Sequence, residues 1–329
     1  MTVLFGVFLL TLLVITAVAI VRTKNLFVAV MLLGIFSLLI AANFFILDAA
    51  DVALTEAAVG AGISTVLFLG ALALTSEYER HATPHRWLSV VVVLSAALVI
   101  LYATFDKPAF GDPNAPVHQH VAPWYLEKTP EYIDIPNVVT AVLGSFRGYD
   151  TLGEVFVVFT AGIGVLFLLS APRSGKERPR PARPELVAIG LREDLIPRVV
   201  GRLLVPFILL FGLYVQFHGE YGPGGGFQAG ALVAAAFILY ALVEGEGRTL
   251  QALPQKALTA LMIIGALLYG AVGLAGIVLG SEFLDYSVLS ADPVSGQQLG
   301  IILIEAGVGM AVTGVLLSIF HAFAARDEI

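Results

Sequence analysis

The first two apolar stretches, TVLFGVFLLTLLVITAVAIV (residues 2–21) and NLFVAVMLLGIFSLLIAANFFIL (residues 25–47), decide the fold class. Each has about the 20 apolar residues that an α-helix needs to cross the hydrocarbon core of a bilayer. No basic residue precedes the first run, and Arg22 and Lys24 follow it. A cleaved signal peptide has the opposite order, so we expect a retained first span. The sequence predicts an all-α polytopic membrane protein.

Composition supports this fold class along the whole chain. Of the 329 residues, 58% are hydrophobic and 13% are charged, whereas about a quarter are charged in a typical soluble domain. The chain contains no cysteine, which excludes disulfides, Cys-ligated iron–sulfur clusters and Cys-based zinc sites. We expect no metal and no cofactor in this chain. The apolar segments predict nine spans, at about residues 2–21, 25–47, 52–74, 87–105, 151–171, 199–217, 226–243, 257–279 and 297–323.

The distribution of lysine and arginine predicts the orientation of these spans, because basic residues gather on the cytoplasmic side of a membrane. With the N-terminus outside, the inner segments and the adjoining helix end at Arg202 hold 15 of the 18 basic residues. The outer segments hold only Lys107, Lys128 and Arg147. The pattern therefore favours an N-terminus outside and a C-terminus inside.

Two long connections divide the chain. The outer segment 106–150 is polar at first and then amphipathic, which suggests a helix lying at the membrane interface. The inner segment 172–198 is basic and rich in proline, as expected of a linker. We interpret its charges as positive-inside residues and expect no nucleic-acid partner. The sequence thus predicts a five-span module (1–171), a cytoplasmic linker (172–198) and a four-span module (199–329).

The stretch HGEYGPGGGFQAG (residues 218–230) lies between two predicted spans. A phosphate-binding loop of the GxxxxGK[ST] type would end in lysine and a hydroxyl residue, whereas Phe227 and Gln228 follow here. A zinc site would need more than one histidine or cysteine. The pattern favours a tight outer turn, in which glycines allow positive φ and proline fixes its own φ. Its turn residues are Gly222, Pro223, Gly224, Gly225 and Gly226.

Acidic residues within or beside the spans are the sharper functional signal, because a charge in hydrocarbon is costly and usually functional. Glu56 and Glu154 lie about one turn inside their spans, and Glu305 lies eight residues into the ninth, near the bilayer middle. These three are the candidate ion-translocation residues, although each can instead be a structural, hydrogen-bonded acid.

Four further residues are candidates for ion access at the outer rim. They are Asp48, Asp51, His218 and Glu220. Asp51 or Thr55 is also a candidate cap for the third span. A solvated pair is the simpler interpretation of His218 and Glu220.

Several motifs resemble a known family. LDAADVALTEAAVGAGISTVLFL and FRGYDTLGEVFVVFTAGIGVLFLL resemble the C-terminal region of the large A-type component of Mrp-type multisubunit sodium/proton antiporters. They also resemble small components of Mrp-related membrane-bound hydrogenases. LLVPFILLFGLYVQFHGEYGPGGGFQAGALVAAAFILYAL and GIILIEAGVGMAVTGVLLSIF are similar to the B-type antiporter component, MnhB.

The resemblance implies a fusion of an A-type tail with a B-type component in the cytoplasmic membrane of a prokaryote. Glu56 and Glu154 would match acids of the A-tail motifs, and Glu305 the acid of the last B-type span. The implied partners are large A-like and D-like pumping subunits, small C-, E-, F- and G-like subunits, membrane lipid, Na⁺ and H⁺. The function implied is a non-enzymatic transport subunit, with a redox-driven module or a scaffold as alternatives.

Overall fold

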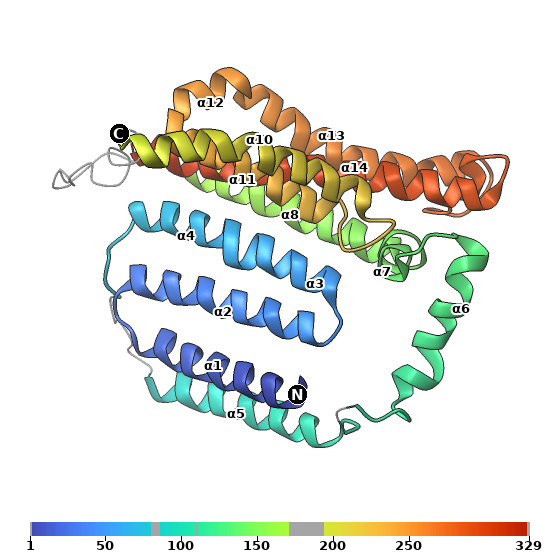
Figure 1. Cartoon of the computed structure of the whole chain (residues 1–329), viewed down its shortest axis with the longest axis horizontal. Coiled ribbons are helices and arrows are strands. Elements are labelled where there is room, and N and C mark those ends of the chain that lie inside the picture. The colour runs from blue at the N-terminus through green and yellow to red at the C-terminus, as the bar shows by residue number, and fades with distance from the viewer. Residues whose placement is uncertain (1, 80–85, 110, 171–193, 328–329) are drawn as a thin grey trace.

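The computed structural model describes residues 2–79, 86–109, 111–170 and 194–327. Over these residues the chain consists of helices and loops (Figure 1). The N-terminal elements are α1 (Thr2–Arg22), α2 (Leu26–Ile46), α3 (Ala50–Thr55), η1 (Glu56–Ile63), α4 (Ser64–Ala73), α5 (Arg86–Phe105), η2 (Val117–Val121), α6 (Ala122–Tyr132), α7 (Val138–Ala141), η3 (Val142–Phe146) and α8 (Gly148–Ser170). The C-terminal elements are α10 (Leu195–His218), α11 (Gly226–Glu244), α12 (Glu246–Ala252), α13 (Gln255–Val278), η4 (Ser287–Leu289) and α14 (Pro293–Asp327).

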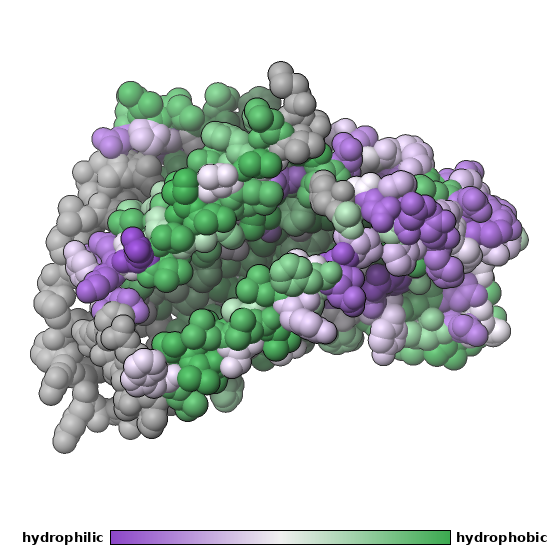
Figure 2. Space-filling view, turned by 90° about the horizontal axis from the view of Figure 1, so that it is seen from below, coloured by the Kyte–Doolittle hydropathy of each residue, from purple (hydrophilic) through white to green (hydrophobic). Residues whose placement is uncertain are grey.

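Nine helical stretches of the described residues are long and apolar enough to cross a membrane, as the sequence predicts. The third comprises α3, η1 and α4, in which the π-helical η1 interrupts the α-helical hydrogen bonding. Figure 2 shows hydrophobic side chains gathered in the middle of the molecule. Hydrophilic residues gather mainly at the end where α6 lies, which is called the α6 end below. The opposite end is called the α12 end.

Helix α14 is the centre of the packing. It contacts α13, α11 and α8 along its length, and α4 near its C-terminal end. Small residues allow these close approaches, as expected for helices in lipid. A Cβ atom on Gly265 would lie 2.5 Å from the backbone oxygen of Gly307, so α13 and α14 meet backbone to backbone there.

The fifth span, α8, lies in space with the last four spans, because it packs on α13 and α14. The first spans form a row in which α1 packs on α2, and α2 on α3, η1 and α4 (Figure 1). The helices η1 and α4 join this row to α11 and α14. The predicted modules 1–171 and 199–329 are therefore consecutive along the chain, but their helices do not form two separate bundles. Most of the predicted linker, residues 171–193, lies outside the described residues.

The amphipathic part of the segment 106–150, for which an interfacial helix is predicted, forms the short helices α7 and η3. Ile133, Ile135 and Ala141 of this part are buried with Ile301 of α14. The apolar residues that suggested an interfacial helix pack against α14, and the polar residues between them bind the loop between α10 and α11. This segment therefore belongs to the core at the α6 end.

Candidate ion-translocation site

The loop 219–225 links α10 to α11 and forms the floor of the site. The backbone N–H groups of Tyr221 and Gly222 donate to His218 O at 2.9 and 3.1 Å, and Gly225 N–H donates to Val215 O at 3.1 Å. Gly225, with φ of 119°, is the one turn residue in the left-handed region. The expectation that positive φ explains the other glycines is wrong. They are needed for close approach, since a Cβ on Gly224 would lie 2.6 Å from Val215 O.

Asn137 fastens this loop to the N-terminal half of the chain. Its Nδ2 group donates to Gly219 O at 3.0 Å, to Gly222 O at 2.9 Å and to the Asp51 carboxylate at 3.0 Å. Its Oδ1 accepts the N–H of Val139 at 3.0 Å and so caps α7. Only 8% of Asn137 is exposed. One amide therefore connects α3, α7 and the glycine loop.

The carboxylate of Glu305 lies against the two ends of the glycine loop. A Cβ on Gly225 would lie 3.1 Å from its Oε1, and a Cβ on Gly219 would lie 3.3 Å from its Oε2. Helix α11 begins at the next residue, Gly226, and the N-terminal end of a helix favours negative charge. The predicted mid-membrane depth is therefore wrong, because Glu305 is level with the ends of α10 and α11. The cause is the length of α14, which begins at Pro293 and extends beyond its neighbours.

A polar bridge joins the Glu305 region to the third span. Gln228, in the first turn of α11, donates through Nε2 to the Thr55 hydroxyl at 2.7 Å. Thr55 donates in turn to the backbone oxygen of Asp51 at 2.9 Å. The expectation that Asp51 or Thr55 caps the third span is therefore wrong: the residue before α3 is Ala49, and no side chain caps it.

Asp51 and Glu220 are the other carboxylates close enough to Glu305 to repel its charge. Burial raises the pKa of Glu220, whose Oε1 is buried without a hydrogen-bond partner among the described residues. The three acids do not converge on one point. Among the described residues, no group of three or more His, Asp or Glu side chains is arranged to hold a metal ion. The arrangement suits a relay between neighbouring groups better than a closed cation cage.

The other predicted residues lie at different places. Glu56 begins the π-helical stretch η1, and its carboxylate and the buried Ser37 hydroxyl of α2 lie on the same side of Gly60. Glu154 is exposed on α8. Its side chain therefore faces away from the interior of this chain.

Two rim candidates are not part of the Glu305 cluster. Asp48 is exposed in the turn between α2 and α3, where its φ is 57°. The His218 ring stacks on Tyr214, with ring centroids 4.7 Å apart.

The sequence reasoning missed the residues that assemble the site: Asn137, Thr140 and Gln228. Thr140 donates to Gly219 O at 2.6 Å, beside the Asn137 bonds. The one local signal was Asn137 itself, which follows Pro136 and precedes an apolar run as an N-cap does. It also missed a buried pair at the α12 end, where His321 Nδ1 lies 3.0 Å from Glu246 Oε1.

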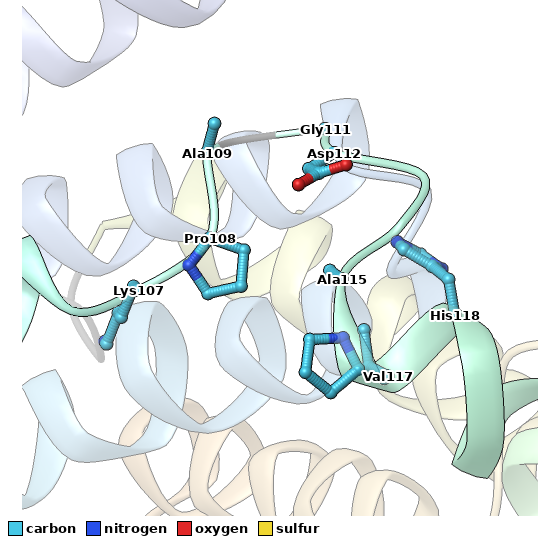
Figure 3. A pocket seen from close by; sticks show the side chains of 9 residues that line it. Lys107, Pro108, Ala109, Gly111, Asp112, Ala115, Val117 and His118 are labelled. Carbon is cyan, nitrogen blue, oxygen red and sulfur yellow. The ribbon is translucent and has the colours of Figure 1, made fainter.

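A hollow of about 330 Å³ opens in the loop before α6 (Figure 3). Pro108, Asp112 and His118 are among the residues that line it. None of the residues around Glu305 lines it, so it is not part of this site.

Comparison with known proteins identifies three segments. Residues 196–318 match the domain related to the MnhB subunit of Na⁺/H⁺ antiporters. Residues 11–77 match MbhD and residues 88–185 match MbhE, which are two of the subunits of MBH.

Individual relatives agree with these matches. A Staphylococcus aureus (strain Newman) protein assigned as antiporter subunit mnhB2 is 36% identical over 129 residues, which are 38% of this chain and 91% of that protein. A Rhizobium meliloti (strain 1021) protein assigned as the A/B component of a K⁺/H⁺ antiporter is 28% identical over 321 residues. That match covers 90% of this chain but only 32% of the relative.

Among solved structures, the Mrp complex from Dietzia sp. DQ12-45-1b contains a similar chain. The TM-score is 0.77 and the identity 27%, over 96% of this chain and 34% of that one. This chain therefore spans about a third of the length of the Rhizobium and Dietzia relatives. It belongs to the family of the MnhB subunit of Na⁺/H⁺ antiporters and is an MnhA/B-like fusion.

Proposed function

We propose that this chain is a membrane subunit of a multisubunit cation/proton antiporter in the cytoplasmic membrane of a prokaryote, and that Glu305 carries protons or cations at its α6 end. The arrangement of the Glu305 carboxylate against the ends of α10 and α11 supports this proposal most directly. Two more acids, Asp51 and Glu220, lie near enough for their negative charges to act on it. Acids in a spanning region are costly and usually belong to ion or proton routes.

The relay extends from Glu305 toward the third span. Gln228 and Thr55 bridge α11 to α3, and Glu56 follows Thr55 directly in the chain. Glu56 lies where η1 departs from α-helical geometry, and π-helical turns are frequent at functional sites. We assign Glu56 as the next group of the same route. The exposed Glu154 is assigned to the boundary with a neighbouring subunit, because a carboxylate facing lipid alone is unfavourable.

The proposed partners are the other Mrp-type subunits, including large A-like and D-like pumping chains. The proposed orientation has the α6 end outside and the α12 end in the cytoplasm. Arg22, Lys24, Arg248 and Lys256 support it, since they flank the spans at the α12 end, and basic residues gather on the cytoplasmic side.

The test is cation-driven proton movement in vesicles that contain the purified complex. Glu305→Gln keeps the shape of the side chain and removes its titration, and it is expected to abolish proton movement driven by Na⁺ or K⁺ gradients. The matched control is Glu127→Gln, which changes an exposed carboxylate on α6. Equal transport by Glu305→Gln, Glu127→Gln and the unmodified complex would contradict the proposal.

A second candidate is the membrane module of a redox-driven complex, favoured by the matches of residues 11–77 and 88–185 to MbhD and MbhE. The chain has no cysteine, so iron–sulfur clusters on Cys ligands would belong to other subunits. Purification of the complex in mild detergent followed by iron and nickel analysis separates the two candidates. Iron- or nickel-bearing partners would establish the second, and large antiporter-like partners without iron would support the first.

A further inference from the structure

A histidine and a glutamate form a buried pair at the α12 end of the molecule. His321, near the end of α14, and Glu246, the first residue of α12, approach to 3.0 Å between Nδ1 and Oε1. The His321 side chain is 5% exposed and the Glu246 side chain 16% exposed. The proposed Glu305 relay does not include either residue.

Other charged groups near this end are paired elsewhere. The Glu244 carboxylate, only 4% exposed, binds Arg202 and Arg248, and Arg198 lies 3.7 Å from it. Lys256 is exposed at the start of α13. Helix α4, which packs on this part of α14, has no titratable residue. Among the described residues, Glu246 is therefore the charged partner that contacts His321.

Burial increases from the pair toward the interior of the molecule. Ser318 precedes His321 by three residues, which places the two side chains next to each other on the helix surface. Ser318 is fully buried, and its hydroxyl has no hydrogen-bond partner among the described residues. Glu246, His321 and Ser318 thus form a polar series of decreasing exposure that begins at the molecular surface.

The chemistry of this series fits proton exchange. Histidine changes charge between about pH 5 and 8, and a neighbouring carboxylate both orients its ring and stabilises the imidazolium. A buried charge without a partner is strongly unfavourable, so each protonation state of His321 depends on Glu246. A partly exposed Glu246 can take a proton from water and pass it to Nδ1.

We propose that His321 and Glu246 form the site at which this chain exchanges protons with the cytoplasm. The inference rests on the proposed function and orientation, and it adds the opposite end of the route. His321 and Glu305 are 16 residues apart on α14, or about 24 Å along the helix axis. A substitution at one residue therefore does not disturb the contacts of the other.

The experiment uses the purified complex in vesicles and measures the rate of cation-driven proton movement against the pH on the cytoplasmic side. His321→Asn keeps an N–H group near the position of Nδ1 but has no group that exchanges protons. Glu246→Gln likewise keeps the shape of the side chain without its charge. The control is Thr313→Val, which removes a buried hydrogen bond from the α14 Thr313 hydroxyl to Gly230 O without changing a titratable group.

Both test variants are expected to slow transport about 100-fold, the lower end of the contribution of a positioned proton-transfer group. They are also expected to flatten the dependence of the transport rate on the cytoplasmic pH, because neither replacement side chain can exchange a proton. Thr313→Val is expected to keep the pH dependence of the unmodified complex. The proposal is overturned if His321→Asn keeps that pH dependence, whatever its rate, or if both test variants fail to assemble while Thr313→Val assembles. Failure of the proposed function would give a different result, because the Glu305→Gln complex would then also transport normally.

Discussion

Replacement of Asn137 by alanine tests the connection between the two halves of the chain. The change removes the Nδ2 bonds to Asp51 and to the backbone oxygens of Gly219 and Gly222, and it removes the cap of α7. Side-chain hydrogen bonds between membrane helices average about 0.6 kcal/mol each in double-mutant cycles. Loss of an asparagine N-cap costs about 1 kcal/mol. Together these values predict a loss of about 2–3 kcal/mol in the free energy of unfolding.

The assay is unfolding of the purified protein in mixed micelles, followed by the fluorescence of Trp124. The centroid of the Trp124 ring lies 5.3 Å from that of the Phe146 ring in η3. Its fluorescence therefore reports on the segment that Asn137 holds in place. The chain has two tryptophans, and a Trp87→Phe background isolates the Trp124 signal. Asn114→Ala, a change in the exposed loop before α6, is the control. The reasoning is refuted if Asn137→Ala and Asn114→Ala have stabilities within about 0.5 kcal/mol, the usual range of surface substitutions.

Three further predictions concern stability. Gly226→Ala is expected to lower the free energy of unfolding by at least about 2 kcal/mol, because its Cβ would overlap the backbone oxygen of Glu305. Gly247 has open space around it, so Gly247→Ala is expected to raise the free energy of unfolding by about 0.5–1 kcal/mol. Denaturant unfolding of both variants measures these changes, and equal effects would contradict the packing at Gly226. Burial raises the pKa of Tyr286 to about 12, above its value of about 10 in the unfolded chain. The neutral phenol therefore stabilises the fold fully below about pH 10, and this stability falls as the pH rises to 12; Tyr286→Phe is expected to weaken that decline, and an unchanged profile would refute it. Burial also raises the pKa of Glu220, so its ionised form destabilises the fold at neutral pH. Glu220→Gln should therefore raise the midpoint of denaturant unfolding at neutral pH. A lower unfolding midpoint would show that the charge of Glu220 is stabilised in the fold.

The spans could be predicted because an apolar run of about 20 residues is long enough to cross the hydrocarbon core of a bilayer as a helix. The fifth span, predicted at 151–171, is found at Gly148–Leu169, and the ninth, predicted at 297–323, at Pro293–Ala325. The ends of the spans differ because caps and packing determine them. Gly148 lies beside the Tyr269 hydroxyl, which donates to its backbone oxygen at 2.7 Å, so α8 begins earlier than hydropathy suggests.

The candidate site could be predicted only in part. Glu305, Asp51 and Glu220 are visible as acids near apolar runs, but their proximity depends on Asn137, which is 86 residues from Asp51 in the chain. No local pattern indicates such a contact. Glu305 was assigned the wrong depth because hydropathy gives the length of α14 but not its height relative to α10 and α11. His321 was missed because a single histidine near a chain end has no distinctive spacing.

The most direct test of the central claim is the chemical reactivity of Glu305 in the assembled complex. Carbodiimides react with protonated carboxyl groups in apolar surroundings, and peptide mass spectrometry locates the modified residue. If Glu305 carries protons and cations, it is labelled, the labelling falls as Na⁺ or K⁺ is raised, and transport is lost in parallel. Labelling of Glu305 that no cation changes, with transport intact after modification, would contradict the account.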